Sequence, residues 1–144
     1  MAGKLELAEE HGRALCFLIE AGGTEHPRWI QTVACYVAIP LVDRAIEQCG
    51  VNCPGDHRDR NGALQRTNKL KGIHDSYAPM YRASKAARYY PTSSGSSEDA
   101  IRQLVRGRLI PLLKSAKKHS GEEEKRIDAL MSSIIAACKS ALES

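Results

Sequence analysis

Apolar residues recur at helical spacing along almost the whole chain, and this pattern limits the fold more than any other feature. Residues 4–20 carry an apolar stripe at intervals of three and four, and so do the segments after Pro27, Ser97 and Ser120. No segment alternates apolar and polar residues as a half-buried strand does. We therefore expect an all-α, up-and-down bundle of five to six helices.

The length of the chain favours one domain. It has 144 residues, of which 42% are hydrophobic, and this suits a single compact core. We expect one domain over residues 1–144, with a core over 4–90, a flexible loop over 91–97 and a C-terminal helical pair over 98–143. The loop prediction rests on the run PTSSGSS, whose Pro, Gly and Ser residues interrupt the helical pattern.

The apolar segments also bear on the compartment. The chain opens without a basic segment that leads into an apolar run, and no stretch approaches the ~18 apolar residues of a membrane span. These two observations predict a cytoplasmic protein without a membrane partner.

The cysteines indicate neither a metal site nor a disulfide framework. There are five, an odd number, and none forms a Cys-x-x-Cys pair. Cys49 and Cys53 lie near a turn and could cross-link or bind a metal, but no second pair accompanies them. Buried thiols are the preferred interpretation, and we expect no metal and no cofactor.

The stretch GDHRDR, residues 55–60, combines a helix start with two residues that handle phosphate. Asp56 is a predicted N-cap, and Asp59 follows it by three residues. His57 and Arg60 are three residues apart and share a helix face, at a first turn whose N–H groups and dipole favour anions. This pattern predicts a phosphate pocket. The alternative is a solvated helix start in which Arg60 pairs with Asp56 or Asp59.

Two further boundaries follow from local patterns. We expect the helix that opens at His57 to run to about residue 73, and a shorter helix with Tyr77, Tyr81, Ser84 and Arg88 to follow. The run SGEE, residues 120–123, has the pattern of a capping box and predicts the start of the last helix.

Residues 28–90 resemble the HEPN superfamily, helical domains named for higher eukaryotes, prokaryotes and nucleotide binding. Three stretches carry the resemblance: WIQTVACYVAIPLVDRAIEQCG, then HRDR at a helix start, then YRASKAARYY. The resemblance implies a HEPN-like bundle that forms a homodimer. It also implies metal-independent RNA cleavage in toxin–antitoxin, abortive-infection or CRISPR-linked systems.

Active HEPN proteins carry an Arg followed by four to six residues and then a His. The histidine can act as general base or acid on the ribose 2′-hydroxyl, and the arginine can stabilise the phosphorane. This chain departs from the motif, because seven residues separate Arg66 from His74, and the four-residue spacing belongs to Lys69. Another branch partners with a nucleotidyltransferase that modifies a tyrosine after the motif histidine, and HDSY, residues 74–77, is loosely similar.

We expect RNA or nucleotide phosphate to bind here, with homodimerisation and with a cognate antitoxin or nucleotidyltransferase as further partners. A net charge of +4 permits RNA without requiring it. The rival hypothesis is a non-catalytic HEPN-like assembly module, and a cofactor carrier lacks the expected Glu-x-x-His pair. The predicted catalytic residues are His57, Arg60 and His74, and the predicted nucleic-acid-binding residues are Arg66, Lys69, Arg88 and Tyr89.

Overall fold

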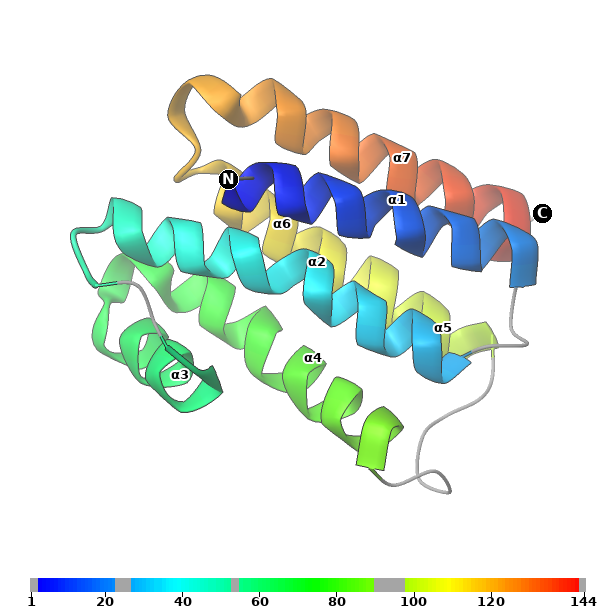
Figure 1. The fold of residues 1–144 in the computed structure, drawn as a ribbon, viewed down its shortest axis with the longest axis horizontal. Helices are drawn as coiled ribbons and strands as arrows, with labels where there is room; N and C mark the ends of the chain where they lie inside the picture. Colours follow the sequence, from blue (N-terminus) through cyan, green and yellow to red (C-terminus); the bar gives the residue numbers. More distant parts are fainter. Residues whose placement is uncertain (1–2, 23–26, 53–54, 90–97, 143–144) are drawn as a thin grey trace.

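The computed structural model describes residues 3–22, 27–52, 55–89 and 98–142, and helices account for nearly all of them (Figure 1). In chain order they are α1 (Lys4–Gly22), α2 (Pro27–Gln48), α3 (His57–Arg66), α4 (Lys71–Tyr89), α5 (Glu98–Leu104), α6 (Ile110–Lys117) and α7 (Glu124–Leu142). A π-helical turn, Val105–Leu109, joins α5 to α6 without a break. Over the described ranges no strand is present, and the all-α prediction is confirmed.

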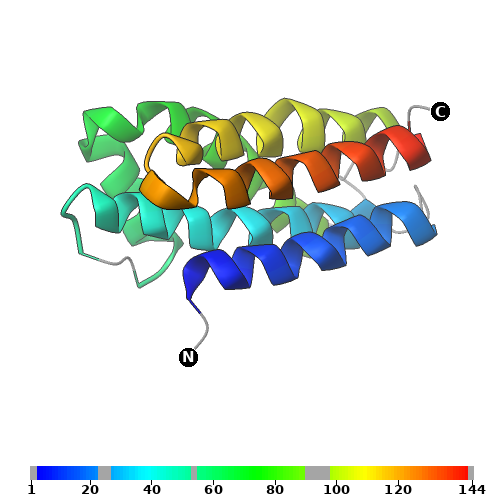
Figure 2. The same ribbon diagram turned by 90° about the horizontal axis from the view of Figure 1, so that it is seen from above.

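The long helices alternate in direction along one common axis, as both views of the bundle show (Figures 1 and 2). α1 packs against α2 and α7, while α2 also contacts α4 and α6. The short α3 lies beside α2 and α4 at one end of the bundle. Because α5, the π turn and α6 form one continuous rod, six helical segments result, which confirms the predicted up-and-down bundle.

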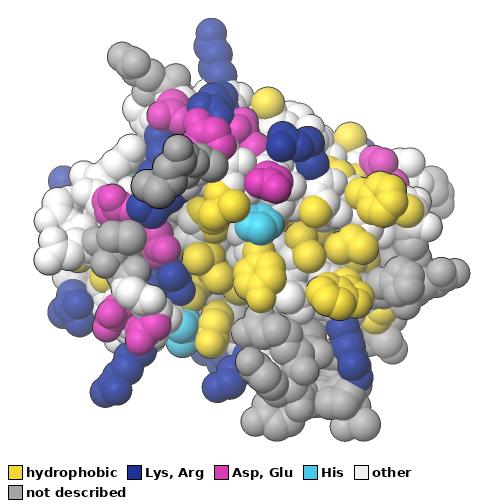
Figure 3. Space-filling model, viewed as in Figure 1, with side chains coloured by type: hydrophobic (Ala, Val, Ile, Leu, Met, Phe, Trp, Pro, Cys, Tyr) yellow, Lys and Arg dark blue, Asp and Glu magenta, His cyan; other side chains and the backbone are white. Residues whose placement is uncertain are grey.

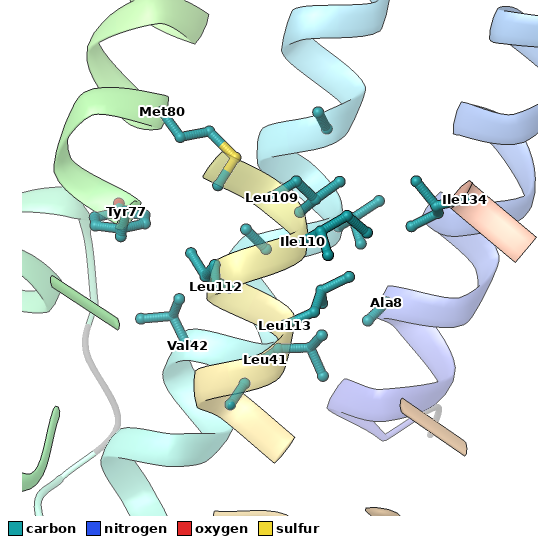
Figure 4. Packing of buried hydrophobic residues seen from close by; sticks show 14 of the residues in the cluster. Ala8, Leu41, Val42, Tyr77, Met80, Leu109, Ile110, Leu112, Leu113 and Ile134 are labelled. Carbon is teal, nitrogen blue, oxygen red and sulfur yellow. The ribbon is translucent and has the colours of Figure 1, made fainter. Parts of the chain in front are cut away.

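One apolar core holds these helices together. Its buried side chains run from Leu5 of α1 to Cys138 of α7 and include residues from both sides of the segment 90–97. In Figure 4, Leu41 of α2 lies against Leu113 of α6. Full burial of such a side chain contributes about 1.5–3 kcal/mol, so these contacts supply much of the drive for folding. The predicted flexible loop, 91–97, lies outside the described residues.

α2 occupies the centre of the bundle. Its mean hydropathy is 1.2 over an 18-residue window, which makes it long and apolar enough to cross a membrane by length and composition alone. The expectation that no stretch approaches that limit is therefore wrong for α2. Within the bundle 72% of the window is buried, because α2 is covered by neighbouring helices on several sides, as a core helix is.

The chain bends between α3 and α4, and here the predicted boundary is wrong. α3 ends at Arg66, Thr67 is extended with φ −113° and ψ 104°, and a 3-10 turn leads into a 19-residue α4. Leu64 and Leu70 are both buried. Six residues apart, they would lie on different faces of one straight helix. The bend at Thr67 allows both to reach the core.

The predicted capping box at residues 120–123 is also absent. Ser120 has φ −106° and ψ −11°, and its hydroxyl makes no cap bond to the following helix. The Ser120 Oγ instead donates to the carbonyl of Ala116 at the end of α6, at 2.9 Å. Ser120 is buried, and this bond satisfies its hydroxyl locally. α7 begins at Glu124, after a 3-10 turn.

Candidate functional site

α3 presents a charged residue to the interior of the bundle. Arg60, Ala63 and Leu64 are buried, at positions that recur with helical spacing. His57 precedes Arg60 by three residues and is half-buried. The prediction that His57 and Arg60 share a face is confirmed by this arrangement, but the face points toward α2 and α4 rather than toward solvent.

Arg60 forms a bidentate ion pair with Asp43 of α2. Its Nε donates to Asp43 Oδ1 at 2.6 Å and its Nη2 donates to Oδ2 at 3.1 Å. Both residues are 8% exposed. Burial opposes the charge on Arg60, but the hydrogen bonds to Asp43 and Tyr77 and the negative charge of Asp43 outweigh it and raise the pKa of Arg60. The predicted pairing of Arg60 with Asp56 or Asp59 is therefore wrong.

Tyr77 of α4 connects this ion pair to His57. Arg60 Nη1 donates to the Tyr77 hydroxyl at 3.3 Å, and the same oxygen lies 2.8 Å from His57 Nδ1. Tyr77 is fully buried, at the margin of the apolar cluster near Met80 (Figure 4). Burial raises the pKa of Tyr77 to about 12, although the hydrogen bond from Arg60 opposes the shift. The hydroxyl therefore keeps its proton at neutral pH.

The His57 ring is held from a second side by Tyr81. The two rings stack with centroids 3.4 Å apart and planes 7° from parallel. Burial lowers the pKa of His57, and the positive charges of Arg60 and Lys85 lower it further, while Asp56 acts in the opposite direction. The neutral imidazole is therefore favoured. We call the set Asp43, Arg60, Tyr77, His57 and Tyr81 the His57 network.

Two carboxylates close the start of α3. Asp56 is the N-cap, as predicted, and its Oδ1 accepts from the backbone N–H of Asp59 at 2.8 Å. Asp59 in turn accepts from the backbone N–H of Gly55 at 3.4 Å. These negative charges lie where the predicted phosphate pocket requires free donors, and Arg60 points away from it. The first turn of α3 therefore lacks the free Arg60 guanidinium that the predicted pocket requires.

His74 lies apart from the His57 network. It lines a hollow of about 250 Å³ whose other lining residues are Leu64, Gln65, Thr67, Asn68 and Lys71. Its Nδ1 is 3.7 Å from Asp75 Oδ1. Because Leu64 follows His57 by seven residues, the hollow begins roughly 10 Å further along α3. The structure thus joins His57 with Arg60 and does not bring His74 to them.

Of the predicted nucleic-acid-binding residues, the structure describes the side chains of Arg66 and Lys69. Arg66 and Lys69 are exposed at the end of α3 and in the following 3-10 turn. Arg66 lies against Gly62 of its own helix, where an added Cβ would come within 2.9 Å of its guanidinium. Arg88 and Tyr89 belong to α4, but their side chains lie outside the described part of the chain.

Four residues at the site were not among the predicted site residues: Asp43, Tyr77, Tyr81 and Lys85. A signal for Asp43 was present, because this acid directly follows the apolar run of α2 that ends at Val42. A charge beside such a run requires a buried partner. For Tyr81 and Lys85 the signal was their spacing, since they follow Tyr77 by one and two turns and share its face.

The described residues offer no alternative metal centre. No group of three His, Cys, Asp or Glu side chains is close enough to hold an ion in the ranges that the structure describes. Cys35 and Cys138 are buried, and Cys16 and Cys49 are half-buried. Cys53, the predicted neighbour of Cys49, lies outside the described residues.

Comparisons with protein-family models, with curated proteins and with solved structures find no match to this chain. The HEPN resemblance accordingly stays a prediction.

Proposed function

We propose that this HEPN-like bundle binds RNA, or another nucleotide phosphate, at the surface around His57. The observation that supports this proposal is the stacked His57–Tyr81 pair beside the exposed Lys85. Lys85 follows Tyr81 by one helical turn, and its charge acts on His57. Proteins that bind single-stranded nucleic acids stack the bases on aromatic side chains and contact the phosphates with nearby cationic side chains.

Arg60 has a different role in this proposal from the one its sequence position indicates. Its guanidinium is bound to Asp43 and Tyr77, so it supports His57 from behind and does not contact ligand. Exposed cations supply the phosphate contacts instead. Lys85 is the first of these, and Arg58 and Arg82 are exposed next to His57 and Tyr81 in the chain.

RNA affinity measured by fluorescence anisotropy over a range of salt concentrations tests the proposal. We expect Lys85→Ala to weaken binding and to reduce the slope of log K against log salt by about 0.7, the value for one contact to single-stranded nucleic acid. Lys139→Ala, on the exposed face of α7, is the matched control and should change neither quantity. Equal effects of the two variants would reject the His57 surface as the binding site.

Ribonuclease activity is the more demanding form of the proposal. It requires a histidine that moves a proton and a cation that stabilises the phosphorane. Purified protein incubated with RNA and a chelator, with His57→Ala, Arg60→Ala and His74→Ala alongside, tests it. Cleavage that persists in chelator and is lost in the His57 variant would support a metal-independent nuclease. If the wild-type protein cleaves none of a varied set of RNAs, the nuclease form of the proposal is rejected and only the RNA-binding form stands.

A second candidate function is assembly, and the surface of α1 and α2 favours it. Apolar side chains gather over these two helices in Figure 3. Large exposed apolar side chains on these two helices are Leu7 (39% exposed), Phe17 (69%), Trp29 (64%) and Tyr36 (41%), and we call the surface that carries them the α1–α2 face. Phe17 also lines a hollow between α1 and α7. His11 packs against Tyr36 within the α1–α2 face, with ring centroids 5.9 Å apart. Exposed apolar side chains that gather on one surface are typical of interaction sites.

We propose a second copy of the chain as the occupant of the α1–α2 face, in line with the homodimer that the HEPN resemblance implies. Light scattering during size-exclusion chromatography should give a dimer for wild type and a monomer for Phe17→Glu. Leu18→Glu is unsuitable as a control because Leu18 packs against the core, so Ser132→Glu at an exposed position of α7 serves instead. A monomeric wild type would reject this use of the face.

A further inference from the structure

We infer that Tyr77 is a positioning residue that holds His57 as a neutral imidazole with its proton on Nε2, so that the site offers phosphate a hydrogen-bond donor rather than a general base. The identity of the ligand rests on the proposed function. The position of the proton is a property of the free protein and is measurable without any ligand.

The argument begins with the protons on the Tyr77 oxygen. Arg60 can only donate, so its bond to Tyr77 uses that oxygen as an acceptor. Tyr77 keeps its own hydroxyl proton, which needs an acceptor in turn. His57 Nδ1 lies 2.8 Å away, at ordinary hydrogen-bond distance. Cys35 and Tyr81 also interact with Tyr77, but a thiol sulfur is a weak acceptor, and no hydrogen bond joins the two tyrosines in the described structure.

Arg60 therefore donates a hydrogen bond to Tyr77, and Tyr77 donates one to His57. We call these two consecutive hydrogen bonds the relay. Asp43 orients the first donor, because its carboxylate binds the guanidinium through Nε and Nη2 and leaves Nη1 directed at the tyrosine. His57 Nδ1 accepts in the relay and carries no proton. A neutral imidazole has one N–H, so the proton lies on Nε2.

The remaining ring nitrogen of His57 has no hydrogen-bond partner among the described residues. It is also not among the buried side-chain atoms of the described residues that lack a hydrogen bond. Within the described residues, His57 Nε2 is therefore neither bonded nor buried without a partner. The Nε2–H group is thus free to donate to a phosphate oxygen.

The same geometry works against proton transfer from a ribose hydroxyl. A general base at this position needs a lone pair on the outward nitrogen, which requires the proton to move to Nδ1. Tyr77 would then receive hydrogen bonds from both Arg60 and His57 and lose its strong acceptor. The groups that face His57 are Asp56 and Arg60 from α3 and Tyr77, Tyr81 and Lys85 from α4, with Asp43 of α2 acting through Arg60.

Long-range proton–nitrogen correlation spectra of the imidazole side chains test the inference in wild-type protein. Above the ordinary histidine pKa of about 6.5, we expect the His57 signals to show a protonated Nε2 and an unprotonated Nδ1. A protonated Nδ1 would overturn the inference. This outcome does not depend on any variant folding correctly, and it does not involve RNA.

The direction in which Tyr77→Phe changes the pKa of His57 is an independent test of the donor order. A bond from the Tyr77 hydroxyl to Nδ1 exists only in the neutral ring, so its removal should raise the pKa of His57. A bond from a protonated Nδ1 to Tyr77 would survive in the charged ring, and its removal would lower the pKa. Tyr81→Phe is the matched control, because no hydrogen bond of its hydroxyl occurs in the described structure, and it should leave the nitrogen protonation unchanged.

His57→Gln tests the role of His57 in ligand binding separately from the relay. Glutamine keeps an N–H donor but cannot take up a proton at neutral pH. We expect RNA binding within a few-fold of wild type in His57→Gln and about tenfold or weaker in His57→Ala. Equal loss in both variants would reject the donor role. Protonated Nε2 together with no RNA binding by wild type would leave the relay intact and refute the proposed ligand.

Discussion

Arg60 and Arg126 show how differently one residue type behaves at two places in this molecule. Arg60 binds one carboxylate, that of Asp43, and its side chain is 9% exposed. Arg126 of α7 is 40% exposed and binds three carboxylates, those of Glu6, Glu9 and Glu123. The exposed arginine thus binds more carboxylates, whereas the buried arginine binds a single carboxylate that is shielded from water.

The difference teaches that burial, more than the number of partners, sets the energetic weight of an ion pair. Water screens the charges around Arg126 and compensates for any partner that is removed. Arg60 has little access to water, so loss of Asp43 leaves its charge without compensation. His57 is linked through Tyr77 to the buried pair and not to the exposed arginine.

The largest expected effect comes from Asp43→Ala. The variant should lose about 3–5 kcal/mol of unfolding free energy, because the Arg60 charge stays buried without a partner. Urea denaturation followed by circular dichroism measures it. The double variant Asp43→Leu with Arg60→Met should recover most of the loss, since two apolar residues then replace both charges. A double variant as unstable as the single one would show that shape, rather than charge, decides the stability of this site.

Tyr77→Phe should have the next largest effect. It keeps the ring that packs against the core and removes the hydroxyl between Arg60 and His57, at a cost of about 1–3 kcal/mol. Tyr81→Phe should change stability far less, because its hydroxyl has no hydrogen bond in the described structure. Thermal unfolding of the two variants makes the comparison, and similar losses would contradict the relay.

The pH dependence of stability should reveal the lowered pKa of His57. The unfolded state binds the proton more readily, so the contribution of His57 is full above its ordinary pKa of 6.5. It is lost as the pH falls from 6.5 toward the lower pKa of the folded state. Wild type minus His57→Gln isolates this contribution from the other histidines. A difference that grows as the pH falls would contradict the sign.

Arg126→Ala should have the smallest effect. We expect a loss much smaller than that of Asp43→Ala, and one that shrinks further as salt is added, since about 1 M salt shortens the Debye length to ~3 Å. Urea denaturation at low and high salt makes the test, with Asp43→Ala as the comparison. If the two losses respond equally to salt, the distinction between the buried and exposed arginines does not hold.

The fold was largely predictable, and the boundaries that failed share one cause. Helical periodicity located the long helices, and Asp56 was correctly assigned as an N-cap. The bend at Thr67 and the use of the Ser120 hydroxyl at the end of α6 were not predictable from local pattern. In each case a buried neighbour decided the outcome, through the burial of Leu70 at the first site and the carbonyl of Ala116 at the second.

The candidate site was predictable only in part. Spacing alone placed His57 and Arg60 on one face of a helix. It did not reveal that the face is buried, although Ala63 and Leu64 continue the same stripe at i+3 and i+4 from Arg60. The partners Asp43 and Tyr77 are each 17 residues from Arg60 in sequence, on separate helices. No local pattern links residues at that distance.

By itself the sequence determined that this chain is a bundle of helices and which residues share a face on each of them. These are local properties, because the 3.6-residue period of the helix is set by the backbone and the apolar stripe follows it. Only the tertiary structure decided which face meets which neighbour. The Arg60 stripe met Asp43 and Tyr77, and in that contact a residue expected to bind phosphate became the buried support of His57.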